Sequence, residues 1–313
     1  YGNEGYYLNF SDNSNTTSTT LGKDNSGNGN NWTPNNVAVH DSVPDTPTNN
    51  FCTFNPLDVN IGMVGTYAEG NCKYTGHSGN LHPRTDATIN PTSGKWYAEF
   101  YFVSGYEATN STIQVGIISC NAGRYASAFD AVGGHDNGNN SDGVVLMNNG
   151  AIATEASLTV LTGLDTWVND DIIGIALDLD NDKFFVSKNG TWFTNGTGTQ
   201  DPANGTNPVY SGGNIASHKK FGFNIHSKGY NGTVHKVNYG QDSTFAGATS
   251  AGGNADSEGI GDFKYAPPNG FLALCTKNLP EPTIKKGSDY FNPVTYTGTI
   301  TDSSTQTVPG VGF

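Results

Sequence analysis

Apolar and polar side chains alternate with a period of two in several short segments in the central part of the chain. In the segment 95–103, four apolar side chains fall on one face, and Tyr97, Glu99 and Tyr101 fall on the other. The segment 112–119 repeats this alternation. Alternation of this kind is typical of a β-strand with one face in the core and the other in solvent. We therefore predict two half-buried strands here.

The segment 171–193 has the clearest pattern, three short strands separated by tight turns at Asp180-Asn181-Asp182 and Lys188-Asn189-Gly190. Asn, Asp and Gly favour such turns because they tolerate positive φ. A hairpin around Asn148-Asn149-Gly150 is predicted on the same grounds. Further strands are predicted at 220–226 and 234–239. Strands this frequent, with no amphipathic helix between them, predict an all-β fold, an antiparallel β-sandwich.

The two ends of the chain differ from this strand-rich centre. Residues 1–50 hold one strand-like stretch followed by sequence rich in Gly, Asn and Pro, which predicts an N-terminal arm or linker. Residues 51–272 are predicted to form the sandwich. Residues 273–313 carry four prolines among polar residues, which predicts an extended C-terminal tail. Because the sequence begins at Tyr1, we expect it to be part of a longer polypeptide.

The charge of the chain narrows the classes of partner. It has 28 acidic and 15 basic residues, which gives a net charge of −13, and charged residues make up only 14% of the chain. Binding to nucleic acid or to an anionic membrane is disfavoured because both need clustered cations. No apolar run approaches the roughly 18 residues of a membrane span, and no signal peptide is recognisable.

The four cysteines, Cys52, Cys72, Cys120 and Cys275, lie far apart and form no C-x-x-C pair. This spacing argues against a zinc module. Three disulfide pairings would be possible if all four were oxidised, but a chain of this length builds its core without cross-links. We predict free thiols.

Catalytic constellations are weak in this sequence. A retaining glycanase needs two carboxylates about 5 Å apart, and the glutamates nearest to a strong strand, Glu99 and Glu107, are separated by eight residues and a bend. No Gly-x-Ser-x-Gly motif accompanies His135 or any other histidine, and no phosphate-binding loop follows a strand. We therefore predict that the chain is not an enzyme and needs no cofactor.

Two groups of possible metal ligands have simpler explanations. Asp178, Asp180 and Asp182 alternate and offer oxygens to Ca²⁺, but two of them flank a turn that Asp favours, and the Gly and distal Glu of a calcium loop are missing. His226 and His235 sit on strands predicted to adjoin, whereas zinc takes at least three protein ligands. We predict no metal site and interpret both histidines as polar surface.

Aromatic residues near loop tips are the remaining candidates for ligand or partner binding. Trp192 follows a tight turn, Tyr125 follows Gly123-Arg124, and Tyr230 lies in a Gly-Tyr-Asn-Gly stretch. Exposed aromatic rings stack on sugars or anchor protein partners. The alternative is that each ring folds back onto the core. Several Asn-x-Ser/Thr sequons, such as that at Asn189, coincide with turns, and we expect them to carry no glycan.

Three motifs resemble the SPRY (B30.2-like, concanavalin-like) domain family. They are Ser93-Gly-Lys-Trp-Tyr-Ala-Glu-Phe100, Asp170-Asp-Ile-Ile-Gly-Ile-Ala-Leu-Asp-Leu-Asp180 and Phe184-Phe-Val-Ser-Lys-Asn-Gly-Thr-Trp192. Their order and spacing are similar to that family over roughly residues 80–245, about half the chain. The resemblance implies a β-sandwich that binds partners through loops at one edge and catalyses no reaction.

The flanking segments resemble the surroundings of SPRY modules in structural proteins of tailed bacteriophages. They are Asp24-Asn-Ser-Gly-Asn-Gly-Asn-Asn-Trp32, Asp45-Thr-Pro-Thr-Asn-Asn50 and Gly270-Phe-Leu-Ala-Leu-Cys-Thr-Lys-Asn-Leu-Pro280. In those proteins the first segment is similar to the end of a preceding concanavalin-like domain, and the tail leads to a further module. The resemblance implies that the chain is a component of a virion tail or fibre. It implies contacts with other virion subunits and a homo-oligomer, for which we expect a trimer. It also implies adhesion to a host-surface glycan. The alternative is a secreted, lectin-like carbohydrate-binding module of a bacterial extracellular protein.

Overall fold

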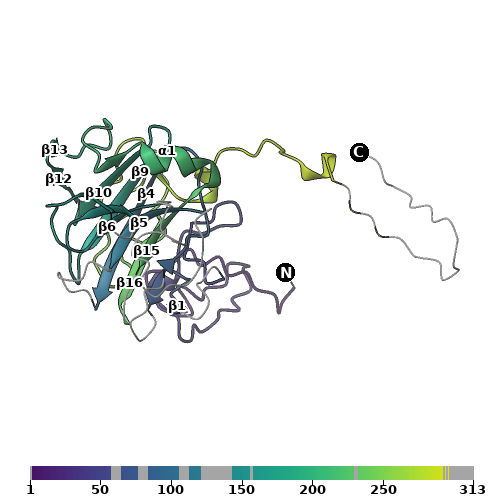
Figure 1. Ribbon diagram of the computed structural model, residues 1–313. Coiled ribbons are helices and arrows are strands. Elements are labelled where there is room, and N and C mark those ends of the chain that lie inside the picture. Colours follow the sequence, from purple (N-terminus) through teal and green to yellow (C-terminus); the bar gives the residue numbers. More distant parts are fainter. Residues whose placement is uncertain are drawn as a thin grey trace, which may run out of the picture. The chain divides into compact units, whose positions relative to one another are not determined.

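The computed structural model describes residues 2–57, 65–76, 84–105, 113–120, 143–155, 158–228, 232–291, 293 and 295. The chain divides into two units, the first from Tyr1 to Asn278 and the second from Leu279 to Phe313. All of the strands in the described residues lie in the first unit (Figure 1).

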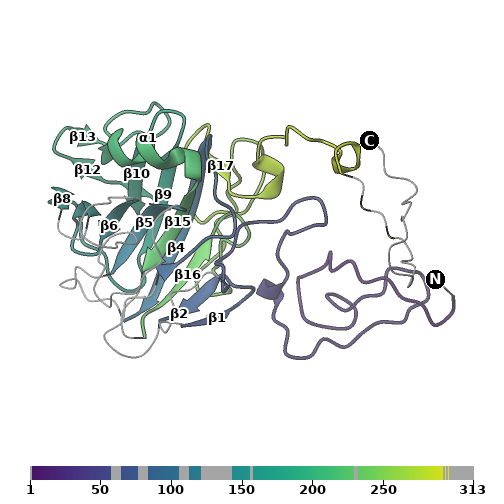
Figure 2. The same ribbon diagram turned by 45° about the vertical axis from the view of Figure 1, so that its right-hand side comes forward.

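Two antiparallel sheets form the body of the first unit (Figure 2). The larger sheet has the order β1-β2-β16-β4-β9-β10-β11, with β14 added beside β10 and β17 beside β4. Its strands are β1 (Thr66–Ala68), β2 (Lys73–Thr75), β4 (Lys95–Ser104), β9 (Ile172–Asp178), β10 (Lys183–Lys188), β11 (Thr191–Trp192), β14 (Tyr210–Ser211), β16 (Val234–Asn238) and β17 (Leu272–Ala273). The predicted all-β, antiparallel sandwich is therefore confirmed.

The smaller sheet has the order β3-β15-β5-β6-β7-β8. Its strands are β3 (Arg84–Thr85), β5 (Gln114–Ser119), β6 (Gly143–Met147), β7 (Ile152–Glu155), β8 (Leu158–Leu161) and β15 (Phe223–Lys228). A two-stranded ribbon, β12 (Thr194–Asn195) and β13 (Gly198–Thr199), lies outside both sheets. In the part of the chain that the structure describes, the helical elements are one short helix, α1 (Gly213–His218), and the 3₁₀ turns η1 (Val39–Asp41), η2 (Lys219–Phe221), η3 (Thr276–Asn278) and η4 (Gly287–Asp289).

Both hairpin predictions are confirmed by the strand register. Val145 pairs with Ala153 across the turn between β6 and β7, and Phe185 pairs with Ala176 between β9 and β10. The turn from β10 to β11 places Asn189 at φ 51° and Gly190 at φ 79°. Positive φ at both central residues is the hairpin geometry that Asn-Gly favours, so this local signal fixes where β11 begins.

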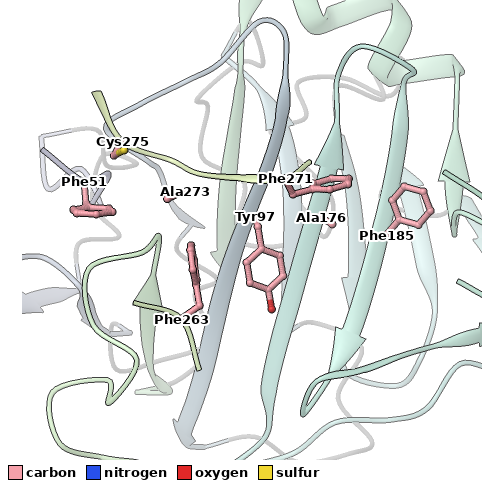
Figure 3. Close-up of a cluster of buried hydrophobic side chains, with 8 residues drawn as sticks. All are labelled: Phe51, Tyr97, Ala176, Phe185, Phe263, Phe271, Ala273 and Cys275. Carbon is pink, nitrogen blue, oxygen red and sulfur yellow. The ribbon is translucent and has the colours of Figure 1, made fainter. Parts of the chain in front are cut away.

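Strands β4 and β5 are buried on both faces rather than on one, so the prediction of two half-buried strands is wrong. In β4 the even-numbered side chains from 96 to 102 belong to the buried core. The opposite face of β4 is covered by the segment 240–275, whose Phe263 and Phe271 join Tyr97 in a second cluster (Figure 3). The Tyr97 and Phe263 ring centroids are 5.1 Å apart. The segment 240–275 lacks the period-two pattern, which is why the sequence does not indicate this cover.

The start of the C-terminal tail also differs from the prediction. Ala273 and Cys275 are fully buried, and β17 pairs in parallel with the beginning of β4. The Cys52 backbone N–H donates a 2.8 Å hydrogen bond to the Leu274 carbonyl. These contacts hold the chain in the first unit as far as Asn278, beyond the predicted boundary at 273. In the second unit, Ile284, Tyr290 and Phe291 are exposed.

The N-terminal segment, residues 2–50, consists mainly of turns arranged around one carboxylate. Asp24 accepts hydrogen bonds from the backbone N–H groups of Tyr7, Ser26 and Asn30 at 2.8, 2.8 and 2.9 Å. An isolated bridge joins Leu8 to Asp24. Backbone donors that converge on one carboxylate order a loop that lacks regular secondary structure, so this segment is more than a plain linker.

Candidate functional site

Trp192 is the predicted binding residue whose position the structure describes. It ends β11, directly after the Asn189-Gly190 turn. Its ring is half-buried and packs against the cluster that contains Phe185 and Phe263. The sequence left two roles open, a ligand platform or a cover for the core. The packing shows that part of the ring does cover the core.

The remaining part of Trp192 lines a surface hollow of about 420 Å³. The rest of its wall comes from the turn before β11, from the residues after Trp192 and from the loop 163–165. The side chains that line it include Asp165, Lys188, Asn189 and Thr191. A volume of this size lies within the usual range of small-molecule sites.

Some polar groups of the hollow form hydrogen bonds with other residues of the chain. The Asn189 amide accepts from the Ile172 N–H at 2.8 Å and donates to Asp171 Oδ1 at 2.7 Å. Lys188 Nζ donates one hydrogen bond, to the Thr166 carbonyl at 2.8 Å. These bonds fix the orientation of the turn and leave two of the three ammonium N–H groups of Lys188 for other acceptors.

Other polar groups of the hollow have no hydrogen-bond partner among the described residues. They are the Asp165 carboxylate, the Thr191 hydroxyl and the indole N–H of Trp192. Asp165 and Thr191 are exposed. An aromatic surface beside free donors and acceptors is the arrangement that binds a molecule with an apolar face and polar edges.

The other two predicted binding residues, Tyr125 and Tyr230, lie outside the described residues, as does Glu107. No sequence pattern indicates Asp165 or Lys188 as binding residues. The pattern predicts Lys188 only as part of a turn, and Asp165 lies in a loop without a motif. Asp165 and Lys188 line the same hollow because two loops that are distant in sequence lie close together in the fold. No local sequence pattern indicates that the two loops meet.

Glu99, which was considered as a catalytic acid, is fully buried under the segment 240–275. It accepts hydrogen bonds from the backbone N–H groups of Lys264 and Tyr265 at 2.9 and 2.8 Å. The Tyr97 hydroxyl and the Asn238 amide each donate to it at 3.2 Å. Burial raises the pKa of Glu99 to about 7, although these donors favour the ionised form. All four contacts come from the protein, so this carboxylate serves as an internal anchor.

The three alternating aspartates of the β9–β10 turn are also used by the protein. Asp178 accepts from the backbone N–H groups of residues 180 and 181 and pairs with Lys95 Nζ at 3.2 Å. Asp180 accepts from the backbone N–H of Gly94 at 2.8 Å, and Asp182 pairs with Lys219 Nζ at 2.7 Å. Among the described residues, no group of three or more His, Cys, Asp or Glu side chains is arranged to hold a metal ion.

The prediction that His226 and His235 are polar surface residues on adjoining strands is wrong. Their strands β15 and β16 belong to different sheets, and both side chains are buried. His235 Nε2 lies 2.6 Å from the Ser227 hydroxyl, which in turn lies 2.9 Å from the Thr85 hydroxyl. Burial lowers the pKa of His235 to about 3. The chain crosses from one sheet to the other between these residues. Ser227, which follows His226 and lies on the opposite face of β15, is the residue that contacts His235.

The cysteines Cys52, Cys72, Cys120 and Cys275 are free, as predicted. Burial raises the pKa of Cys52 to about 11 and that of Cys72 to about 12. Thiols with raised pKa values remain protonated and are weak nucleophiles, so neither thiol suits covalent catalysis.

A second hollow, of about 510 Å³, lies in the N-terminal segment and is lined by apolar side chains that include Phe10, Trp32 and Val43. Phe10 is 53% and Trp32 50% exposed. The Trp32 ring lies 4.8 Å from that of Tyr6. Solvent-exposed apolar groups gathered in this way are typical of interaction surfaces.

No protein-family model matches the chain, and no curated protein matches it. Among solved structures, the chain is similar to the crystal structure of the SPRY domain of human HERC1, with 17% sequence identity and a TM-score of 0.41. This similarity covers 59% of the present chain and 96% of that domain. The assignment of the fold class is based on the two antiparallel sheets that the structure contains. In the described residues, no helix has the length and apolar character needed to cross a bilayer.

Proposed function

We propose that this chain is a non-catalytic, SPRY-like binding and assembly module of a bacteriophage tail or fibre protein. In this proposal the sandwich presents the Trp192 hollow to a ligand, and the two ends of the chain contact neighbouring virion subunits. The sequence motifs around Trp96, Leu177 and Asn189 support the SPRY assignment, and the flanking segments support the virion assignment.

The observation that carries the assembly role is the exposure of apolar side chains at both ends of the described chain. Tyr6, Tyr7 and Trp32 are exposed near the beginning, and Tyr290 and Phe291 are 63% and 71% exposed near the end. Large aromatic side chains that are exposed in a single chain are commonly buried in an interface when the chain binds a partner. Most soluble homo-oligomers are closed and symmetric, and the resemblance to virion fibre proteins leads us to expect a trimer.

The mass of the protein in solution tests this assembly. Light scattering after size-exclusion chromatography is expected to give about three times the 33.0 kDa of a single chain. The double substitution Tyr290→Ser and Phe291→Ser is expected to shift the mass towards the single chain, because it removes apolar contact area. A matched control, Val160→Ser, alters an exposed apolar residue of β8 and is expected to leave the mass unchanged. A single-chain mass for the unmodified protein at all concentrations would contradict the assembly role.

The location of the protein tests the virion assignment separately. Purified phage particles are expected to contain this chain when their proteins are identified by mass spectrometry. A secreted carbohydrate-binding module is the second candidate, because the Trp192 hollow suits a sugar. A parent gene that encodes a secretion signal and lies away from virion genes would favour that second candidate and contradict the first.

A further inference from the structure

We propose that the Trp192 hollow binds one or two residues of a neutral saccharide without a metal ion. This proposal rests on the proposed function as a binding module and names the ligand class of its site. Its basis is the position of Trp192 beside polar groups that the described part of the protein leaves without partners.

The first step of the argument is the rigidity of the aromatic surface. The Trp192 ring packs on the cluster of Phe185 and Phe263, and the turn before it is fixed by both ends of the Asn189 amide. An aromatic ring held in this way loses little conformational entropy on binding. The C–H face of a pyranose ring is apolar and packs on such a surface.

The second step is the set of polar groups around the ring. Asp165 offers carboxylate acceptors, Lys188 offers two further N–H donors, and the Thr191 hydroxyl both donates and accepts. The indole N–H of Trp192 adds a donor. Sugar hydroxyls act as donors and acceptors at once, so they match this mixed set better than a purely apolar or purely anionic ligand does.

The third step concerns charge and metal. The ionised side chains named in the hollow are one acid, Asp165, and one base, Lys188, so their formal charges cancel. The hollow therefore has no net charge that would favour an anionic or a cationic ligand over a neutral sugar. Many lectins bind sugars through a cation, but among the described residues no three His, Cys, Asp or Glu side chains are grouped to hold one, and we therefore expect binding that resists chelation.

The experiment uses the full chain and three neutral disaccharides, cellobiose, lactose and N,N′-diacetylchitobiose. Binding is measured by isothermal titration calorimetry and by saturation-transfer NMR, with and without EDTA. At least one of the three is expected to bind with a millimolar or lower Kd that EDTA does not change.

The substitution Trp192→Ala is expected to weaken that binding at least tenfold. Because this ring also packs on the core, Asp165→Ala is the second variant. It lies on the surface and is expected to weaken binding several-fold without changing the thermal unfolding midpoint.

Phe221→Ala is the matched control, since Phe221 is an exposed aromatic residue of η2 that lines neither hollow. It is expected to leave the Kd unchanged. The absence of binding by all three disaccharides, binding that Trp192→Ala and Asp165→Ala leave intact, or loss of binding in Phe221→Ala would each overturn the proposal. A negative result here leaves the virion assignment open to its own test by mass spectrometry of particles, so the two failures are distinguishable.

Discussion

Substitution of Glu99 by Ala is expected to lower the free energy of unfolding by about 3–5 kcal/mol. The reason is that Glu99 is the common acceptor for the backbone N–H groups of Lys264 and Tyr265, which lie more than 160 residues away along the chain. Without the carboxylate these donors stay buried without an acceptor, and a cavity remains beneath them. Urea unfolding followed by circular dichroism measures the change.

Two further variants separate the anchoring role from a general effect of removing an acid. Glu99→Gln keeps one acceptor oxygen and nearly the same volume, so it is expected to cost less than Glu99→Ala. Glu258→Ala removes an exposed acid from the same covering segment and is expected to change the stability by no more than about 0.5 kcal/mol. Equal, small effects of all three substitutions would show that the covering segment does not depend on Glu99.

The second large effect is a loss of stability in acid that originates from His235. Burial lowers the pKa of this histidine from 6.5 to about 3 in the folded protein, so only the unfolded chain takes up a proton between these two values. This contribution to stability is therefore complete above pH 6.5 and is lost as the pH falls towards 3. The linkage relation gives a loss on the order of 4 kcal/mol over that range.

Glu99 produces the opposite slope over part of the same range. Burial raises its pKa from 4.5 to about 7, so the folded protein holds the proton more tightly than the unfolded chain does. Its contribution is complete below pH 4.5 and is lost as the pH rises through 7. Between pH 4.5 and 6.5 the two contributions offset each other, which predicts a broad stability plateau and a decline on either side.

Urea unfolding at intervals between pH 3 and pH 8 measures this profile. His235→Gln is expected to remove most of the acid decline at the cost of a lower maximum, because the new amide still faces Ser227. His218→Gln, in helix α1, is the control and is expected to keep the acid decline, because His218 lies outside the His235 cluster. An acid decline of unchanged size in His235→Gln would contradict this assignment of the titrating group.

The features that the sequence predicts correctly are those encoded over a few residues. The Asn189-Gly190 turn and the alternation in 171–193 are local, so β9, β10 and β11 were predicted close to their observed limits. The position of Trp192 after that turn follows from the same signal. The class of fold was predicted for the same reason, because it depends on how frequent the strands are.

The features that the sequence does not predict depend on contacts between distant segments. Glu99 was assigned to a solvent-facing side of β4 because the segment that contains Phe263 and Phe271 has no strand pattern. His226 and His235 were placed on adjoining strands because a short connection usually joins neighbours, whereas here it crosses between sheets. The hollow beside Trp192 also depends on Asp165, which a separate loop supplies.

The central claim is that this sandwich binds without catalysing a reaction, and an assay for released reducing ends tests it most directly. The protein is incubated with cellulose, chitin and the polysaccharides of a host cell surface, in parallel with Glu99→Gln. The account predicts no release above a protein-free blank for either protein. Release by the unmodified protein that Glu99→Gln abolishes would contradict the account, since it would make Glu99 a catalytic acid.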